Sequence, residues 1–251
     1  MAAQLTLGPL LYHWPAEKRL DFYARIADEA AVDTVYLGEV ICSKRAPFFD
    51  DHYLAVAERL ARGGKRVVFS SLCEVMLKRE RNMVEAFSTI GDDEIEANDS
   101  SVLYHVSGRP HRIGALMNLY NEEALAFYAR RGATHVCLPA ELPGASVRLM
   151  AARAQALGVG LEVQVFGRVS LAVSARCYHA RAHGRVKDNC QFVCEDDPDG
   201  MELRTLSDQK FLAINGIQTL SHSYLDLMPE LADIVAMGVG HLRLSPHTLD
   251  M

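Results

Sequence analysis

The sequence predicts an α/β protein folded as a (β/α)8 barrel of the TIM type, and three observations lead to this prediction. Short β-branched runs alternate with longer amphipathic stretches along most of the chain, which is typical of repeated βα units around a parallel sheet. Eight such runs occur, which is the number of strands in a closed barrel of this kind. The length of 251 residues and the hydrophobic content of 49% suit a single core of that size.

The expected elements follow one another in regular order. Pro15 is well placed to begin the first helix, and Asn98 or Asp99 could cap a helical turn that starts near Ser100. Glycines at positions 63, 64, 132 and 158 are expected to end helices. We expect strands at residues 5–11, 33–39, 65–72, 94–97, 112–117, 133–138, 160–166 and 241–245. We expect longer helices at residues 15–29, 51–61, 75–90, 122–131, 143–157 and 225–237.

The regular alternation breaks after the seventh strand. We expect one domain over residues 1–251, with a cysteine-containing insertion at residues 170–222. The insertion is predicted to begin with a helix at residues 170–183 and to end in a β-hairpin at residues 201–221. The chain ends at Met251, shortly after the eighth strand, so the helix that closes such a barrel is expected to be missing. Either the chain is truncated there or a partner covers that flank.

The insertion carries three of the six cysteines, Cys177, Cys190 and Cys194, among polar residues. Thiols at this density suggest ligands for a soft metal or a cluster, and Cys42, which follows the second strand, is the best candidate for a fourth. Both segments would emerge at the carboxyl ends of barrel strands, where active sites of such barrels lie. The spacing is neither that of a zinc ribbon nor that of a bacterial ferredoxin. The residues alone favour a 4Fe-4S cluster over zinc, and cysteines without metal remain the third alternative.

Several basic residues flank these cysteines, and we expect them to offset thiolate charge and lower the pKa of the thiols. They are Lys44, Arg45, Arg176, Arg181, Arg185 and Lys187. Cys137, inside a strand, is expected to be a buried apolar residue, and Cys73 either packs in the core or serves as a reserve ligand. His179 and His183 could share a metal, but Ala180 stands where a zinc protease has glutamate.

Polar residues at the other strand exits complete the candidates for a site. They are Glu39, Glu74, Asn98, Asn118, Glu141, Arg168 and His247. Arg168 and the acids are candidates for substrate contacts, although acids around a barrel mouth are also typical of a solvated rim.

The composition limits the classes of function. The net charge is −6 and no lysine- or arginine-rich tract occurs, which argues against a nucleic-acid partner. No run of eighteen apolar residues and no signal peptide is visible, so we expect no transmembrane segment and a cytoplasmic location.

Three motifs closely resemble the collagenase-like peptidase family, historically called U-thirty-two, and within it the members that serve ubiquinone biosynthesis. They are YLGEVICSKR, FGRVSLAVSARCYHARAHGRVKDNCQFVC and DGMELRTLSDQKFLAINGIQTLS. The resemblance implies a 4Fe-4S cluster on Cys42, Cys177, Cys190 and Cys194 and a heterodimer with a sister cluster protein, UbiU. It also implies oxygen-independent hydroxylation of the ring of a polyprenylated ubiquinone precursor, with a lipid-carrier-like accessory protein and prephenate as the oxygen donor.

Peptidase activity is not expected, because the sequence has no metal-protease helix, no nucleophile elbow and no recognisable Ser-His-Asp arrangement. Two other functions remain open. The chain could be a non-catalytic scaffold subunit braced by a metal, or it could hydroxylate RNA bases as relatives in the family do. The acidic composition disfavours the second of these.

Overall fold

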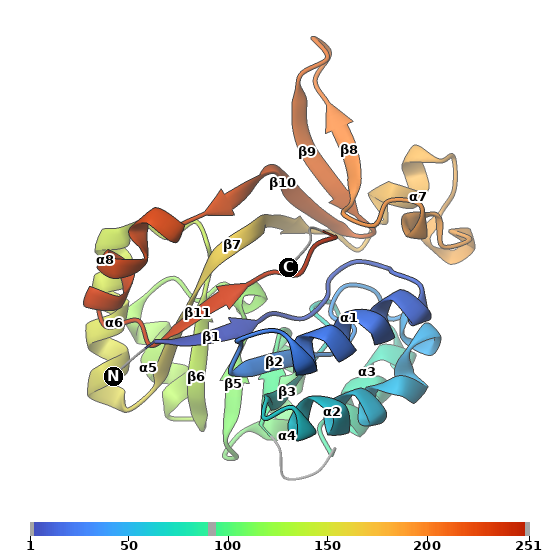
Figure 1. The fold of residues 1–251 in the computed structure, drawn as a ribbon. Coiled ribbons are helices and arrows are strands. Elements are labelled where there is room, and N and C mark those ends of the chain that lie inside the picture. Colours follow the sequence, from blue (N-terminus) through green and yellow to red (C-terminus); the bar gives the residue numbers. More distant parts are fainter. Residues whose placement is uncertain (1–2, 90–93, 249–251) are drawn as a thin grey trace.

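The computed structural model describes residues 3–89 and 94–248. Within these residues, eight parallel strands form a closed ring with helices around it (Figure 1). The order is β11-β1-β2-β3-β4-β5-β6-β7, and β11 pairs with both β1 and β7, which closes the ring. The predicted (β/α)8 barrel is therefore confirmed.

Most elements lie where the sequence predicts them. Asp99 caps α4, because its side chain accepts a hydrogen bond of 2.8 Å from the N–H of Ser101. The ring strands are β1 (Gln4–Leu7), β2 (Thr34–Leu37), β3 (Arg66–Ser70), β4 (Ile95–Ala97), β5 (His111–Ile113), β6 (Ala133–Leu138), β7 (Gly160–Val173) and β11 (His241–Leu244). The surrounding helices are α1 (Ala16–Asp28), α2 (Tyr53–Arg62), α3 (Lys78–Phe87), α4 (Ser100–Val106), α5 (Glu122–Ala129), α6 (Gly144–Leu157) and α8 (Leu231–Ala236).

Two predicted helices are wrong in large part. Residues 170–173 belong to β7, and only α7 (Tyr178–Ala182) is helical in the stretch predicted as a helix at residues 170–183. The helix predicted from residue 225 begins at Leu231, after β10 (Gln218–Asp226) and a 3₁₀ turn at Met228–Glu230. The reason is the same in both places, because β7 and β10 pair with each other and these ladder hydrogen bonds outweigh local helix propensity.

Smaller differences occur at two strand ends. The first strand ends at Leu7 rather than at residue 11, and residues Ala115–Met117 form a 3₁₀ turn instead of continuing β5. The last residue of the helix predicted at residues 75–90 lies outside the described residues, as do residues 249–251 at the end of the chain.

The long strand β7 joins the parallel ring to an antiparallel extension of the same sheet. Its first half lies in the ring, where Phe166 pairs with Leu244 of β11, and its second half pairs antiparallel with β10 as far as Val173 opposite Gln218. Strands β8 (Met201–Arg204) and β9 (Lys210–Asn215) extend this antiparallel sheet, so the predicted hairpin is confirmed. Figure 1 shows β8 and β9 standing out from the barrel beside the segment that carries α7.

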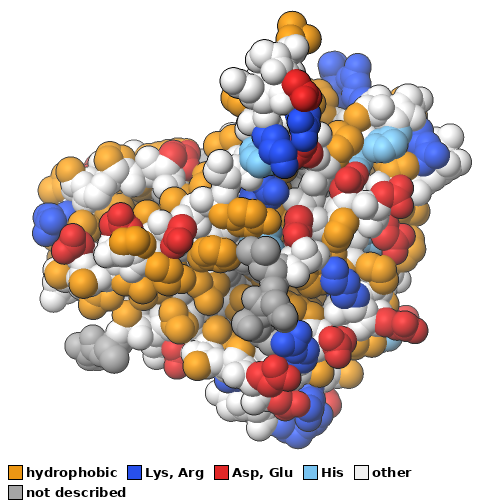
Figure 2. All heavy atoms as spheres, turned by 45° about the horizontal axis from the view of Figure 1, so that its top comes forward, with side chains coloured by type: hydrophobic (Ala, Val, Ile, Leu, Met, Phe, Trp, Pro, Cys, Tyr) orange, Lys and Arg blue, Asp and Glu red, His pale blue; other side chains and the backbone are white. Residues whose placement is uncertain are grey.

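Buried hydrophobic side chains fill the space between the ring and its helices. On the face that Figure 2 shows, acidic and basic side chains are interspersed with hydrophobic ones, and the β8–β9 hairpin projects from the surface. In the described part of the chain, the helices are all too short or too polar to cross a membrane.

Candidate functional site

The four cysteines selected from the sequence line one cavity, where the insertion meets the exit of β2. Cys42 comes from the barrel side, and Cys177, Cys190 and Cys194 come from the insertion. Cys177 and Cys194 are buried, with exposed fractions of 8% and 9%. The structure thus brings together two segments that lie more than a hundred positions apart in the sequence, as the cysteine pattern predicts.

On the barrel side, Glu39 fixes the loop that holds Cys42. One carboxylate oxygen of Glu39 accepts the backbone N–H groups of Ile41 at 3.1 Å and of Cys42 at 3.0 Å. The N–H of Arg45 then donates to the Cys42 carbonyl at 2.8 Å. These bonds give the loop a defined turn, so the direction of the Cys42 side chain is set before any ligand binds.

On the insertion side, backbone geometry turns three thiols toward the same space. Cys177 is the N-cap of α7, and its sulfur accepts the N–H of Ala180 at 3.4 Å. Between Cys190 and Cys194, two consecutive non-glycine residues, Gln191 and Phe192, have φ values of 49° and 54°. Left-handed conformations are costly for such residues and occur together at functional sites more often than elsewhere. This turn lets Cys190 and Cys194 face one cavity although they are only four positions apart.

Arg45 is the cation at the centre of the site. It is 1% exposed, and its guanidinium donates to the carbonyl of Leu11 at 3.0 Å and to the side-chain oxygen of Asn215 at 2.9 Å. It also interacts with the thiols of Cys194 and Cys42. Arg45 therefore joins the β1 exit, the hairpin and the cysteine cavity, and it supplies positive charge where thiolates would form.

The pKa of the thiols departs from the expectation drawn from the sequence. Burial raises the pKa of Cys42, Cys177 and Cys194 above its ordinary value, and Arg45 only partly opposes this effect. The prediction that the surrounding cations lower these values is wrong for the three cysteines, because the loss of water outweighs the charge of the nearby guanidinium. A metal that binds Cys42, Cys177 and Cys194 therefore has to displace protons that burial makes harder to remove.

The donor set fits a cluster of iron and sulfide. Four cysteine thiols are the usual ligands of a 4Fe-4S cluster, and a neighbouring guanidinium offsets their negative charge. The thiols lie around a narrow space of about 20 Å³, so a cluster would have to push the side chains apart to enter. Over residues 3–89 and 94–248, no three His, Cys, Asp or Glu side chains are arranged to hold a single metal ion.

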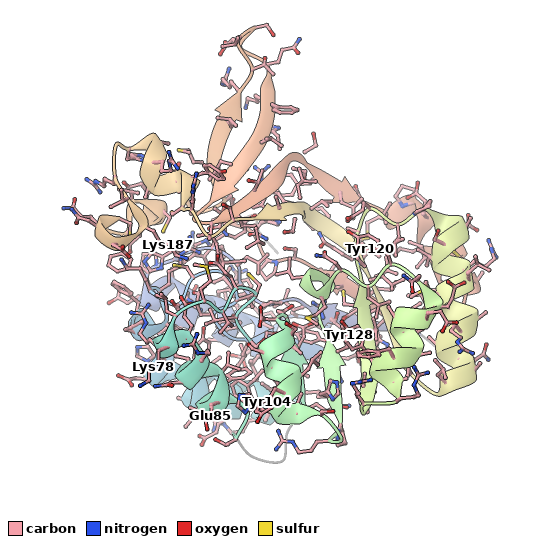
Figure 3. All side chains as sticks on the ribbon, turned by 180° about the vertical axis from the view of Figure 1, so that it is seen from behind. Lys78, Glu85, Tyr104, Tyr120, Tyr128 and Lys187 are labelled. Carbon is pink, nitrogen blue, oxygen red and sulfur yellow. The ribbon has the colours of Figure 1, made fainter. Side chains whose placement is uncertain are left out.

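Basic residues also surround the outer side of the insertion. A second cavity, of about 460 Å³, lies beside Cys177 and is lined by Arg176, Arg181, Arg185 and Lys187. Lys187, which Figure 3 labels between the insertion and the barrel, donates to Glu74 at 2.9 Å. Lys44 donates to the carbonyl of Lys187 at 2.7 Å. Lys44, Glu74 and Lys187 thus hold the insertion against the exits of β2 and β3.

The remaining cysteines and histidines lie outside the set of four thiols. Cys137 is fully buried in β6, as predicted. Cys73 packs against the same small hydrophobic group as Cys42 but does not line the cysteine cavity. His179 does line it, and its ring nitrogen Nε2 lies 2.9 Å from Asp197. His183 stacks on His179 with ring centroids 5.5 Å apart, so the two histidines flank the site.

Asn98 donates to the carbonyl of Ser71 at 3.3 Å, and Nε2 of His247 accepts a hydrogen bond of 3.1 Å from the N–H of Arg168. The other three strand-exit residues lie in two different places. Asn118 and Glu141 line a cavity of about 200 Å³ at the ends of β5, β6 and β7. Arg168 instead binds main-chain carbonyls of Ser221 and His222, and its guanidinium lies 4.7 Å from the ring centre of Tyr224. Arg168 therefore stabilises the pairing of β7 with β10 through its Nη1 group, while its Nε group is buried and has no hydrogen-bond partner.

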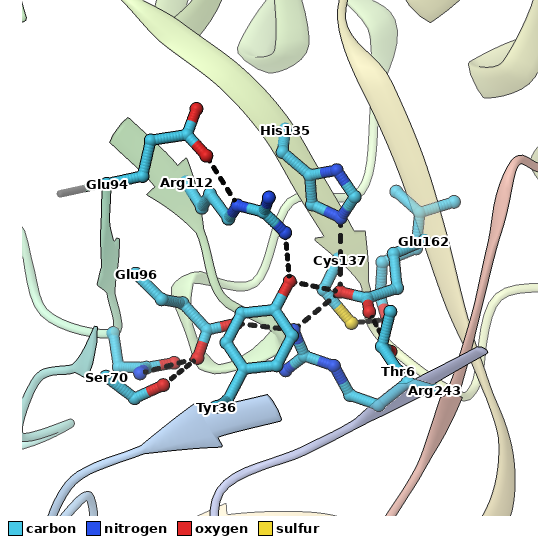
Figure 4. Close-up of polar contacts among 12 residues, drawn as sticks. Thr6, Tyr36, Ser70, Glu94, Glu96, Arg112, His135, Cys137, Glu162 and Arg243 are labelled. Carbon is cyan, nitrogen blue, oxygen red and sulfur yellow. Dashed lines mark hydrogen bonds and ion pairs between the residues drawn. The ribbon is translucent and has the colours of Figure 1, made fainter. Parts of the chain in front are cut away.

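The interior of the barrel holds a buried charged network that the sequence analysis missed (Figure 4). Arg243 bridges Glu96 at 2.6 Å and Glu162 at 2.5 Å, and its guanidinium lies 4.1 Å from the ring centre of Tyr36. Burial alone would raise the pKa of Glu162, but Arg243 and His135 outweigh it and hold the pKa well below its ordinary value. A signal was present, because single charged residues interrupt the apolar strands as IEA, HRI, LEV and LRL.

His13 should make the stability of the protein depend on pH. It is 2% exposed between Phe48 and Phe192, and burial, with Arg45 and Arg19 nearby, lowers its pKa to about 4. As the pH falls, His13 is protonated in the unfolded chain before it is protonated in the folded protein. The contribution of neutral His13 to stability is therefore fully present above pH 7 and is lost between about pH 6.5 and pH 4. At pH 5 the loss from His13 should be about 2 kcal/mol.

We expect His13→Phe to remove this part of the pH dependence, because neither ring nitrogen of His13 has a hydrogen-bond partner. Urea unfolding of both proteins at pH 7 and pH 5 checks the prediction. His241, whose pKa burial also lowers to about 4, contributes equally to both proteins. An identical fall in stability in the two proteins would contradict the role given to His13.

Comparison with known proteins agrees with this architecture. Over its whole length the chain is similar to the solved structure of the U32 peptidase Mk0906, with a TM-score of 0.51, 9% sequence identity and 96% of that chain covered. At this identity the similarity is one of fold. The spore cortex-lytic enzyme SleL of Bacillus megaterium QM B1551 matches more weakly, with a TM-score of 0.34, 9% identity and 72% of that chain covered. The model of Peptidase family U32 matches residues 22–251. The chain therefore belongs to peptidase family U32.

Proposed function

We propose that this chain is the iron-sulfur subunit of an oxygen-independent hydroxylase in ubiquinone biosynthesis, equivalent to the family member UbiV. In this role it would form a heterodimer with UbiU and act on the ring of a polyprenylated precursor. A lipid-carrier-like protein would assist, and prephenate would serve as the oxygen donor. The observation that carries the proposal is the common cavity of Cys42, Cys177, Cys190 and Cys194, which are the four cysteines of the motifs that resemble these proteins.

Each residue of the site has a defined task in this proposal. Cys42, Cys177, Cys190 and Cys194 would hold a 4Fe-4S cluster, which supplies one-electron transfer when bound. Arg45 keeps a fixed positive charge beside Cys194 and Cys42. Phe192 and Val193 line the cavity and limit the access of water to the thiols. Lys187 and Lys44 hold the insertion against the barrel, so that three ligands stay close to the fourth.

Metal analysis after anaerobic purification tests the proposal. We expect about four iron and four sulfide per chain with a brown visible spectrum. A Cys177→Ala, Cys194→Ala double variant should lose nearly all of the iron and the colour. Cys73→Ala is the matched control, because Cys73 lies next to the site but outside the cavity, and it should keep both.

The opposite result would favour the scaffold function. Stoichiometric zinc without iron, under strictly anaerobic handling, would leave a metal that braces the insertion and carries no electrons. If the cluster is present, ring hydroxylation by the chain with UbiU, and not by either protein alone, would distinguish a catalytic subunit from a scaffold.

A further inference from the structure

A deep apolar pocket lies between α2 and α3, on the barrel side of the cysteine site. Its volume is about 480 Å³, which is within the range of small-molecule binding sites. The floor is formed by the exits of β2 and β3, and the walls are formed by the start of α2 and the inner side of α3. Hydrophobic side chains such as Leu54, Phe69, Met83 and Phe87 form most of the lining. The polar residues Glu39, Asp50, Ser70 and Ser71 also line the pocket.

The shape of the helix layer keeps this pocket open to solvent on one side. Leu54 at the rim is 65% exposed, so part of the apolar surface of the pocket faces solvent. Lys78 and Glu85, which Figure 3 labels on α3, do not line the pocket, so the helix presents separate polar and apolar faces. Binding of an apolar ligand is favourable at walls of this kind, because it removes apolar surface from water.

The inner end of the pocket has one polar group without a partner. Glu39 lines the pocket and is 7% exposed. One of its carboxyl oxygens holds the Cys42 loop, and the other is buried with no hydrogen-bond partner. Buried polar atoms normally have hydrogen-bond partners. The unpaired oxygen of Glu39 therefore marks a place for a polar group of a ligand or for a water molecule. The same residue thus ends the pocket and supports the loop of Cys42.

We propose that this pocket binds the isoprenoid chain of the ring substrate, with a polar group of the substrate near Glu39. The identity of the ligand rests on the proposed function. The type of ligand rests on the mainly apolar lining and on the carboxyl oxygen of Glu39 that has no partner. It brings the polar head of the bound molecule to the side of the loop that carries Cys42. The tail would leave past Leu54 toward solvent.

Calorimetric titration of the full chain with a phenol that carries a farnesyl chain tests this proposal. We expect saturable binding of farnesylphenol and at least tenfold weaker binding of unsubstituted phenol. Ala86→Trp, which places a large side chain in the pocket from an exposed position, should weaken binding of farnesylphenol at least tenfold. Glu85→Trp, one position along the same helix but outside the pocket, should leave binding unchanged.

Leu54→Trp at the rim is a second blocking variant, which keeps the test decisive if Ala86→Trp fails to fold. No saturable binding to the native chain, or equal binding by the blocking variants and Glu85→Trp, would overturn the proposal. Repeating the titration with the Cys177→Ala, Cys194→Ala variant separates the two proposals. If the native chain binds farnesylphenol but contains no iron, the pocket is supported and the cluster is rejected. If it contains iron but does not bind farnesylphenol, the cluster is supported and the pocket is rejected.

Discussion

Replacing Arg243 by leucine is expected to destabilise the protein by about 3–5 kcal/mol, which is the usual cost of leaving buried charges without a partner. Arg243 is the guanidinium that bridges Glu96 and Glu162 inside the ring, where the two carboxylates are 1% and 0% exposed. Its loss would leave two buried acids without the cation that bridges them. Urea unfolding at pH 7 measures the effect.

Two controls make the result specific to burial. Arg59→Leu removes an ion pair of 2.5 Å with Asp28 in which both side chains are about half exposed, and it should cost less than about 1 kcal/mol. The loss of unfolding free energy caused by Arg243→Leu should also become smaller as the pH falls from 7 to 5. Losing Arg243 removes the strongest opposition to burial, so the pKa of Glu162 lies higher in the folded variant than in the native protein and the variant takes up a proton more readily as the pH falls. Equal costs at the two arginines would contradict a structural role for the network.

Replacing Arg45 by methionine is expected to weaken the retention of the proposed cluster by about 10–100-fold, the usual effect of losing a group that supports metal ligands. The variant loses the buried cation beside Cys194 and Cys42 and leaves the side-chain oxygen of Asn215 without its donor. The measurement is the rate of iron loss to a chelator under anaerobic conditions. Unfolding in urea should also show a cost of about 3 kcal/mol.

Arg181→Met is the matched control for Arg45→Met. Arg181 is an exposed cation that lines the outer cavity beside Cys177, so its loss changes the net charge equally but removes no buried contact. We expect its iron retention to stay within about twofold of the native protein, since exposed charges are screened. Equal iron loss in both variants would show that general positive charge, and not the position of Arg45, governs retention.

The barrel was predictable because its signals are local. Buried parallel strands are continuous apolar runs, and residues such as Asp99 and Gly158 mark helix ends wherever they occur. The extension of β7 to Val173 was not predictable in this way. The segment after Phe166 has no strand signal strong enough to exclude a helix, and its conformation depends on pairing with β10, which lies some fifty positions later.

The cysteine site shows the same division. The types and density of the thiols indicated which residues meet, but their raised pKa depends on burial that the sequence does not display. The network around Arg243 was missed because a single charged residue in a short apolar strand does not indicate a partner. The partners lie on other strands, and only the closed ring brings them together. The bonds from Arg168 to the main chain of β10 were not predicted, because nothing local shows that β10 passes within its reach.

The pairing of Val173 with Gln218 also bears on how such a protein can change during evolution. The segment at residues 174–217, which carries three thiols, begins and ends next to paired positions of β7 and β10. Its two ends are therefore adjacent, as in a long hairpin loop. Segments with adjacent ends can be lengthened, exchanged or deleted without rethreading the rest of the fold. A two-residue Asn-Gly turn would in principle join the same two strands. Three of the four thiols of the site would therefore be gained or lost together in a single exchange of this segment, whereas Cys42 belongs to the barrel and would stay.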